Sequence, residues 1–385
     1  MEFDLSWILL GLPLAFGLGW LASRLDLRQL RLENRQNPKA YFKGLNHLLN
    51  EQQDQAIDAF IEAVQQDPDT SELHFALGNL FRRRGEFERA VRVHQHLLSR
   101  GDLSTADHDR ARYALALDFL KAGLLDRAEE NLRQLDNSVH ATQAHIALLG
   151  IYERSREWSR AAEMAAQLSD SGQGSFDVRR AHYLCEQAAG LPSTQAGEAE
   201  ALLRQAMQIA PANAHAYMAL AQMQAAQGQP GEALDTLLEA ARSVPQAVPL
   251  MAESIARLAV EQQRHPQALV LLQQHYAQAG SLDVLEALIR LEADAHVPEA
   301  PGQAERYARH LAQEPSLLAA SRWIRHEPLT HEQHRAAFER ALDRAAKPLQ
   351  RYRCAACGFE AQQHFWQCPG CQNWDSYPPR RVEEL

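Results

Sequence analysis

The sequence has few cysteines, few aromatic residues and a deficit of positive charge. Of its five cysteines, four stand in two C-x2-C pairs near the C-terminus, and Cys185 stands alone in a stretch that we expect to be a buried helix. Aromatic residues make up 7% of the chain, a share that suits helix pairs rich in alanine and leucine. The net charge of -10 argues against a nucleic-acid-binding surface, so we expect no nucleic-acid partner.

Catalytic motifs are missing as well. The sequence contains no phosphate-binding loop, no nucleophile elbow and no glycine-rich dinucleotide turn. His326, His331 and His334 suggest a metalloprotease helix at first sight. Their intervals of five and three residues do not place two imidazoles one helical turn apart, and Pro328 interrupts the helix. We therefore assign no catalytic residue and favour a binding protein over an enzyme.

The two cysteine pairs are the most specific signal that is present. Cys354 and Cys357 form the first pair, Cys368 and Cys371 form the second, and ten residues separate them. Two thiolates from each tight turn close a tetrahedral shell with no open position for a substrate, which indicates a structural metal site. Thiolates suit zinc and iron alike, so the sequence predicts one tetrahedral metal ion of either kind, bound by all four cysteines. A disulfide framework is the weaker alternative.

An uncharged run from Leu5 to Ala22 stands near the N-terminus. Its eighteen residues suffice to span a bilayer core of about 30 Å as a helix. Acidic residues precede the run and no signal-peptidase site follows it, so a membrane anchor is favoured over a cleaved signal peptide. Basic residues predominate directly after the run, which places the rest of the chain in the cytoplasm. Small residues on one face of this helix predict packing against another membrane helix: Gly11, Ala15 and Gly19.

The region between the anchor and the cysteine pairs repeats with a period of 34 residues. Gly44 recurs as Gly78, and Ala199 recurs as Ala233. This is the tetratricopeptide pattern, in which small residues stand where two antiparallel helices approach closely. We predict an all-α superhelical solenoid of eight or nine helix pairs. The signature fades between Ser281 and Ala345, as terminal repeats that cap the stack require.

Four segments follow from these patterns: an anchor at 1–23, a basic juxtamembrane segment at 24–39, a repeat array at 40–346 and a metal module at 350–377. The first helix of each repeat lines the concave face of such an array, so we predict partner-binding residues on successive turns of one first helix: Phe75, Asn79 and Arg82. We also expect nearby arginines to offset the negative charge of four thiolates on a divalent ion: Arg351, Arg353, Arg380 and Arg381.

The order of these segments resembles that of a known family. A short N-terminal anchor precedes a tetratricopeptide array, and the stretches Tyr352 to Phe359 and Trp366 to Trp374 carry the two cysteine knuckles. Together they resemble the lipopolysaccharide assembly protein B family of Gram-negative bacteria along the whole chain. Internal stretches are similar too, notably Leu77 to Gly85 and Ala122 to Glu129. The tetratricopeptide motif alone is unspecific, but its combination with both knuckles is not.

The resemblance implies a function. By this resemblance, the protein is expected to be an inner-membrane protein that faces the cytoplasm. It would limit lipopolysaccharide production by bringing the deacetylase of early lipid A synthesis to the membrane AAA+ protease FtsH. The metal ligands of the family correspond to Cys354, Cys357, Cys368 and Cys371, in a rubredoxin-like module that packs against the repeats. Other lipopolysaccharide synthesis or transport proteins are further expected partners.

Three hypotheses compete at this point. The first is an adaptor that holds a client on the repeat surface beside a membrane protease. The second is a scaffold that gathers lipopolysaccharide-synthesis proteins at the inner membrane without controlling proteolysis. The third is a rubredoxin-type electron carrier, which the sequence disfavours because it has no flavin or nicotinamide domain and electron transfer needs no helical array of this length.

Overall fold

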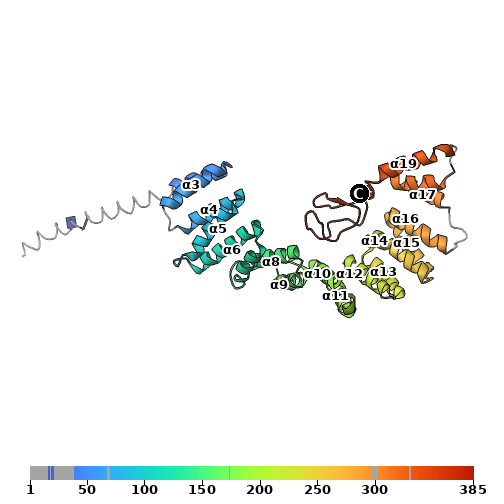
Figure 1. Cartoon of the computed structure of the whole chain (residues 1–385), viewed down its shortest axis with the longest axis horizontal. Coiled ribbons are helices and arrows are strands. Elements are labelled where there is room, and N and C mark those ends of the chain that lie inside the picture. The colour runs from blue at the N-terminus through green and yellow to red at the C-terminus, as the bar shows by residue number, and fades with distance from the viewer. Residues whose placement is uncertain are drawn as a thin grey trace, which may run out of the picture. The chain divides into compact units, whose positions relative to one another are not determined.

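The computed structural model describes residues 16–17, 19–20, 39–66, 70–172, 174–295, 302–328 and 331–385. The chain divides into two compact units, Met1–Ile151 and Tyr152–Leu385. Both units consist of antiparallel helix pairs (Figure 1). The described residues form nine such pairs, so the predicted tetratricopeptide solenoid is confirmed for this part of the chain.

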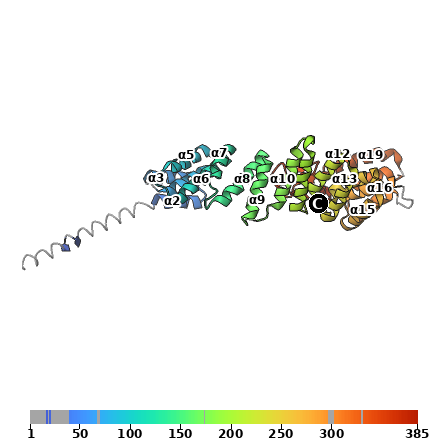
Figure 2. The ribbon, with the colours of Figure 1, turned by 90° about the horizontal axis from the view of Figure 1, so that it is seen from below.

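The described residues of unit 1 form α2 (Lys39–Leu49), α3 (Gln53–Gln66), α4 (Ser71–Arg84), α5 (Phe87–Ser99), α6 (Thr105–Lys121), α7 (Leu125–Arg133) and most of α8 (Ala141–Ser155). Those of unit 2 form α9 (Trp158–Asp170), α10 (Asp177–Gly190), η1 (Ser193–Gln195), α11 (Ala196–Ile209), α12 (Ala214–Ala226), α13 (Pro230–Ser243), η2 (Pro245–Ala247), α14 (Val248–Glu261), α15 (His265–Ala279), α16 (Leu282–Asp294), α17 (Gln303–Gln313), α18 (Leu317–His326), η3 (Glu332–His334), α19 (Arg335–Ala346), β1 (Tyr352–Arg353), β2 (Glu360–Ala361) and η4 (Val382–Glu384). Figure 2 shows successive helices of unit 2 from below.

One small residue recurs at the same place in seven of the pairs. The fourth residue of the second helix is an alanine that is at most 6% exposed, because the first helix of the pair lies directly over it. The last two pairs have Arg306 and Phe338 at this place, and Phe338 is 53% exposed. The fading of the repeat signature after Ser281 is thus a real change in packing. The seven alanines are Ala56, Ala90, Ala128, Ala161, Ala199, Ala233 and Ala268.

Two glycines in first helices allow a large side chain of the second helix to approach the backbone. A Cβ atom on Gly44 would lie 2.8 Å from Cε2 of Phe60. A Cβ atom on Gly78 would lie 2.5 Å from the ring of His94, which stands 34 residues after Phe60 in the same place of the next repeat. Any larger residue at either glycine would push the paired helices apart.

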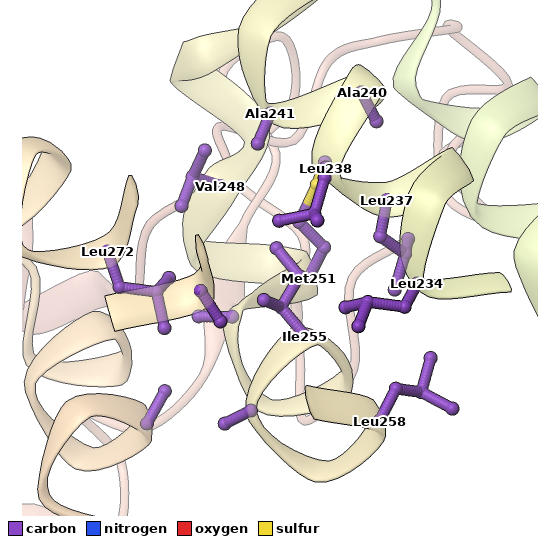
Figure 3. Packing of buried hydrophobic residues seen from close by; sticks show 14 of the residues in the cluster. Leu234, Leu237, Leu238, Ala240, Ala241, Val248, Met251, Ile255, Leu258 and Leu272 are labelled. Atoms are coloured by element: carbon purple, nitrogen blue, oxygen red, sulfur yellow. The ribbon is translucent and has the colours of Figure 1, made fainter. Parts of the chain in front are cut away.

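The largest group of buried apolar residues lies in unit 2, where α12 to α16 pack together. Figure 3 shows Leu234 and Leu238 of α13 facing Met251 and Ile255 of α14, with Leu272 of α15 beside them. Each of these side chains is at most 3% exposed, and burying one stabilises the fold by roughly 1.5–3 kcal/mol. This core holds consecutive repeats in a fixed relation and so provides a firm platform for the C-terminal segment.

The predicted membrane run falls mostly outside the described residues. Gly11 and Ala15 are not described, and Gly19 belongs to a helical piece whose side chains are exposed. In the part of the chain that the structure describes, no helix has the length and apolarity needed to cross a bilayer.

Candidate metal centre and its seat on the repeats

The two cysteine knuckles share one backbone pattern. In the first, β1 and β2 pair antiparallel with Tyr352 opposite Ala361, and the amide N–H of Cys354 donates to the carbonyl oxygen of Phe359 (2.9 Å). In the second, the amide of Cys368 donates in the same way to Asn373 (2.9 Å).

The residue after the second cysteine has a positive φ in both knuckles, 78° at Gly358 and 62° at Gln372. This left-handed turn lets both cysteines of a pair point to one side, as an ion between the knuckles requires.

The four sulfur atoms lie at the spacing that a tetrahedral ion needs. All are within 4.8 Å of one another, with Sγ of Cys354 3.8 Å from Sγ of Cys371 and Sγ of Cys357 3.7 Å from Sγ of Cys368. Sulfur atoms about 2.3 Å from a central ion form a tetrahedron with edges of about 3.8 Å. A disulfide needs about 2.05 Å, so the disulfide alternative is wrong, and all five cysteines are free.

The four predicted ligands therefore fit one metal ion. Among the described residues, these four cysteines are the group of potential ligand side chains that lie close enough together to hold a metal ion. When bound, an ion would join the two knuckles and leave no position for a substrate. Zinc and iron form S4 shells of the same geometry, so the structure does not select between them. The first cysteine of each knuckle is buried (1% and 0% exposed), whereas Cys357 is exposed.

The module rests on first helices of unit 2 through two stacked ring pairs. The indole of Trp374 stacks on the imidazole of His182 in α10 (centroids 4.7 Å apart, planes at 20°). The indole of Trp366 stacks on His215 in α12 (4.9 Å, 16°). In addition, Nε1–H of Trp374 donates to Oε1 of Glu153 in α8 (3.0 Å), which also accepts from the hydroxyl of Tyr183. Aromatic pairs of this kind contribute about 0.5–1.5 kcal/mol beyond their buried area.

Two imidazoles and a carboxylate form a chain across this contact. Nδ1 of His215 lies 3.1 Å from Nδ1 of His182, whose Nε2 lies 2.8 Å from Oδ2 of Asp375. Burial, and then the charges that His182 and His364 would carry, lower the pKa of His215 to about 3. His215 is therefore neutral at pH 7. We assign Nδ1–H of His215 as donating to His182 and Nε2–H of His182 as donating to Asp375, which leaves the Asn213 amide nitrogen, 3.3 Å from the same Nε2, in contact without a hydrogen bond.

The C-terminal tail fastens the module to the last two repeats. The guanidinium of Arg381 donates to both carboxylate oxygens of Asp283 in α16 (2.7–3.1 Å). Burial alone would disfavour the charged guanidinium, but the Asp283 carboxylate prevails and the pKa of Arg381 is raised. Such a bidentate pair fixes orientation as well as distance.

Two glutamates of the tail cap helix N-termini. Oε1 of Glu384 accepts from the amide of Leu282, the first residue of α16 (2.8 Å). Oε1 of Glu383 accepts from the first two amides of α18, and its Oε2 accepts from the hydroxyl of Ser316 (2.8 Å). A carboxylate there satisfies otherwise unpaired amides and opposes the positive end of the helix dipole.

The contacts of the module and tail follow a regular scheme. Leu250 of α14 packs in the same cluster as Tyr352, Cys354 and Cys368. With the contacts above, the C-terminal segment touches five first helices of unit 2, α10, α12, α14, α16 and α18, and also Glu153 in the last turn of α8, which belongs to unit 2. Figure 1 shows the module, in dark red, on the inner side of the curve that these helices form.

Sequence reasoning missed most of this seat. Three of the four arginines predicted as counter-charges to the metal have carboxylate partners, since Arg351 and Arg353 pair with Glu360 and Arg381 pairs with Asp283. Their role as counter-charges stays a prediction. His182 and His215 carry a usable signal, since they stand 33 residues apart in first helices of consecutive repeats. Cys185 is buried in α10, as predicted.

The predicted partner-binding residues lie in unit 1. Phe75 is 1% exposed, packed with Leu97 and beneath the guanidinium of Arg110 (4.1 Å), so its prediction as a contact residue is wrong for this structure. Arg82 is partly exposed and donates to Oδ1 of Asp118 in α6 (2.9 Å) and to the side-chain oxygen of Asn79.

Asp118 is fully buried and also lies 2.5 Å from Nδ1 of His94, so Arg82, Asp118 and His94 join α4, α5 and α6. Partner binding by Asn79 and Arg82 stays a prediction.

Comparisons with known proteins agree with the two-part architecture. Residues 352–378 match the family described as rubredoxin metal binding domain, and residues 193–258 match the tetratricopeptide repeat family. A solved tetratricopeptide repeat protein from Parabacteroides merdae is 14% identical, with 66% of this chain and 97% of that protein covered and a TM-score of 0.34.

Full-length relatives are more informative. A protein of Escherichia coli named lipopolysaccharide assembly protein B is 29% identical over 405 residues, which cover 98% of each chain. A protein of the same name from Haemophilus influenzae is 26% identical and covers 97% of this chain and 98% of its own length. The chain is therefore homologous to lipopolysaccharide assembly protein B over nearly its whole length, which confirms the resemblance that its knuckles and repeats predicted.

Proposed function

We propose that the protein is a membrane-anchored adaptor that limits lipopolysaccharide synthesis by promoting degradation of UDP-3-O-acyl-N-acetylglucosamine deacetylase by FtsH. The observation that carries this proposal is the homology to lipopolysaccharide assembly protein B over 98% of the chain. A role in regulating lipopolysaccharide assembly follows directly from it. The partners FtsH and the deacetylase come from the family resemblance.

The architecture supports a binding function. A tetratricopeptide array offers an extended surface for protein segments, and the metal module has a closed S4 shell suited to structure. Unit 1 has no comparable module of its own among its described residues, so its first helices are the better candidates for holding a client.

Membrane attachment belongs to the proposal as well. The uncharged run from Leu5 to Ala22 would anchor the chain, and the basic residues after it would keep both units in the cytoplasm. A client bound to the array would then meet a membrane protease at a raised effective concentration without any new contact. A reporter fused after Leu385 should be active only if it works in the cytoplasm, and the protein should stay in membranes after a salt wash.

The decisive experiment is the half-life of the deacetylase in cells with and without this protein. We expect a longer half-life and more lipopolysaccharide in its absence, and no effect of the protein when FtsH is inactive. A variant lacking residues 1–23 should leave the array folded but fail to shorten the half-life at native abundance. An unchanged deacetylase half-life would favour the scaffold instead, and full activity of the untethered variant would rule out tethering.

A further inference from the structure

Unit 2 contains a cleft of about 550 Å³ between the repeats and the metal module, which we call the Trp366 cleft. One wall comes from the start of α10 and from the links that precede α12 and α14. The opposite wall comes from the module, including Trp366 and Tyr377. Its volume falls within the range of about 300–1,000 Å³ that is typical of ligand sites.

The walls of the cleft are apolar. Val178 of α10 is 50% exposed and Leu250 of α14 is partly exposed, although both side chains line a concave surface. Trp366, which is partly exposed, adds an aromatic face from the module, and the buried Tyr377 lies behind it. Apolar groups left accessible in a concavity gain from being covered, so this surface favours a ligand with an apolar part.

The charged groups of the cleft are of one sign. Asp177 and Asp375 line it, whereas no lysine or arginine is among its described lining residues. Burial lowers the pKa of His364, the imidazole on the same wall, so it adds no positive charge at pH 7. The side chain of Asp375 is 45% exposed, and His182 holds its Oδ2. Two carboxylates beside apolar walls attract a cation and repel phosphate or an acidic peptide.

We propose that the Trp366 cleft binds a basic, apolar segment of a protein partner. An arginine or lysine head would lie toward Asp177 and Asp375, while its aliphatic stem and a neighbouring apolar side chain would cover Trp366 and Leu250. The inference rests on the proposed function only in taking the ligand to be a protein segment.

Binding at this cleft is linked to the metal. Trp366, Asp375 and Tyr377 belong to the module, while Asp177 and Leu250 belong to the repeats, so the cleft exists only while the module is seated. A ligand that binds only the seated form stabilises it by mass action. The bound segment therefore slows metal release, and removal of the metal abolishes binding of the segment.

The test uses the full chain in nanodiscs of phosphatidylcholine, a lipid without net charge. The probe is a fluorescent, end-blocked hexapeptide of alternating leucine and arginine, and binding is followed by fluorescence anisotropy. Two control peptides replace arginine with glutamate or leucine with serine. We expect the leucine–arginine peptide to bind and both controls to bind at least about tenfold more weakly.

Matched variants show whether the peptide binds in the Trp366 cleft. Asp177→Lys should weaken binding of the leucine–arginine peptide by at least about tenfold. Asp177→Asn should weaken it by up to about fivefold, as expected for loss of a partly exposed ion pair. Glu239→Lys makes the same change of charge on an exposed site of α13 outside the cleft and should change the affinity less than about twofold. Stripping the metal with a chelator should abolish binding, and the peptide should slow metal transfer to a chromogenic chelator.

Several results would overturn the inference. These are equal binding of the arginine and glutamate peptides, equal losses in Asp177→Lys and Glu239→Lys, binding that survives metal removal, and no binding at 1 mM peptide. The deacetylase is absent from this assay. If the peptide does not bind but the protein still shortens the deacetylase half-life in cells, only the inference about the cleft is wrong. If the peptide binds but the half-life is unchanged, only the proposed function is wrong.

Discussion

The two units use the same repeat but hold their first helices in different ways. In unit 1, side chains of neighbouring helices pair directly, with Arg82 of α4 and His94 of α5 both on the buried Asp118 of α6. In unit 2, the C-terminal module and tail touch the first helices α10, α12, α14, α16 and α18. Beyond their apolar cores, the helices of unit 1 are thus joined by buried charges, whereas the first helices of unit 2 are joined by the module and tail.

We expect this difference to give the units separate roles. A first-helix face that the module covers is unavailable to a client except at clefts along the contact. A face held by side-chain pairs keeps its remaining surface accessible. We therefore expect clients to bind mainly on unit 1 and the metal to control unit 2.

The largest effect should come from loss of the metal ligands. Cys354→Ser with Cys357→Ser should remove the single zinc or iron ion, unfold the module and lower the melting temperature of unit 2, because metal binding and folding are coupled and structural zinc is worth about 10–16 kcal/mol in small peptides. Elemental analysis and calorimetry check this. Cys185→Ser is the control, which should keep the metal. Near-native melting of the double variant would disprove the structural role.

The next effect should be confined to unit 1. Asp118→Ala leaves Arg82 and the buried His94 without their carboxylate, which should destabilise unit 1 by about 3–5 kcal/mol and leave unit 2 unchanged. Urea denaturation with hydrogen exchange in α4 to α6 measures it. Asp126→Ala, at an exposed site of α7, should cost less than about 0.5 kcal/mol. Equal effects of the two substitutions would show that the buried charges do not hold these helices together.

Acid should weaken unit 2 through His215. The pKa of His215 is 6.5 in the unfolded chain and about 3 in the folded one. Between these two values the unfolded state binds a proton that the folded state does not. The folded state is therefore fully favoured above pH 6.5 and loses free energy of unfolding as the pH falls below that value. The loss at pH 5 should be about 2 kcal/mol. His215→Phe keeps a ring against Trp366 but cannot take up a proton. Stability measured with excess zinc from pH 7 to 5 should fall less steeply in this variant, and equal slopes would contradict the assignment.

The smallest effect should come from the tail. Glu383→Ala removes the carboxylate from the first two amides of α18 but leaves the N-cap Ser316, and it should cost about 1 kcal/mol, seen as faster hydrogen exchange in the first turn of that helix. Glu239→Ala, at an exposed site of α13, is the matched control and should leave α18 unchanged. If hydrogen exchange in the first turn of α18 is equally fast in both variants, the Glu383 carboxylate contributes nothing to the stability of that turn.

Local and periodic features could be predicted from the sequence. The metal ligands form a short spacing pattern, and close helix contacts recur as small residues every 34 positions. Contacts between distant segments leave no such pattern. Trp374 stacks on His182, although most of the sequence of unit 2 separates them. The acidic C-terminal residues have the composition of a solvated tail, and only the structure shows that they cap two helix N-termini.

The error at Phe75 has a similar cause. Periodicity shows which face of α4 a residue occupies but not what the next repeat places on it, here Arg110 of α6.

A bound metal should stabilise the first helices of unit 2 through the module and leave those of unit 1 unchanged. Hydrogen exchange of the full chain, before and after metal removal by a chelator, tests it most directly. We expect protection from exchange to fall in α10, α12, α14, α16 and α18 when the metal is lost, whereas α4, α5 and α6 should keep theirs. Unchanged protection in α10 to α18, or an equal loss in both units, would contradict it.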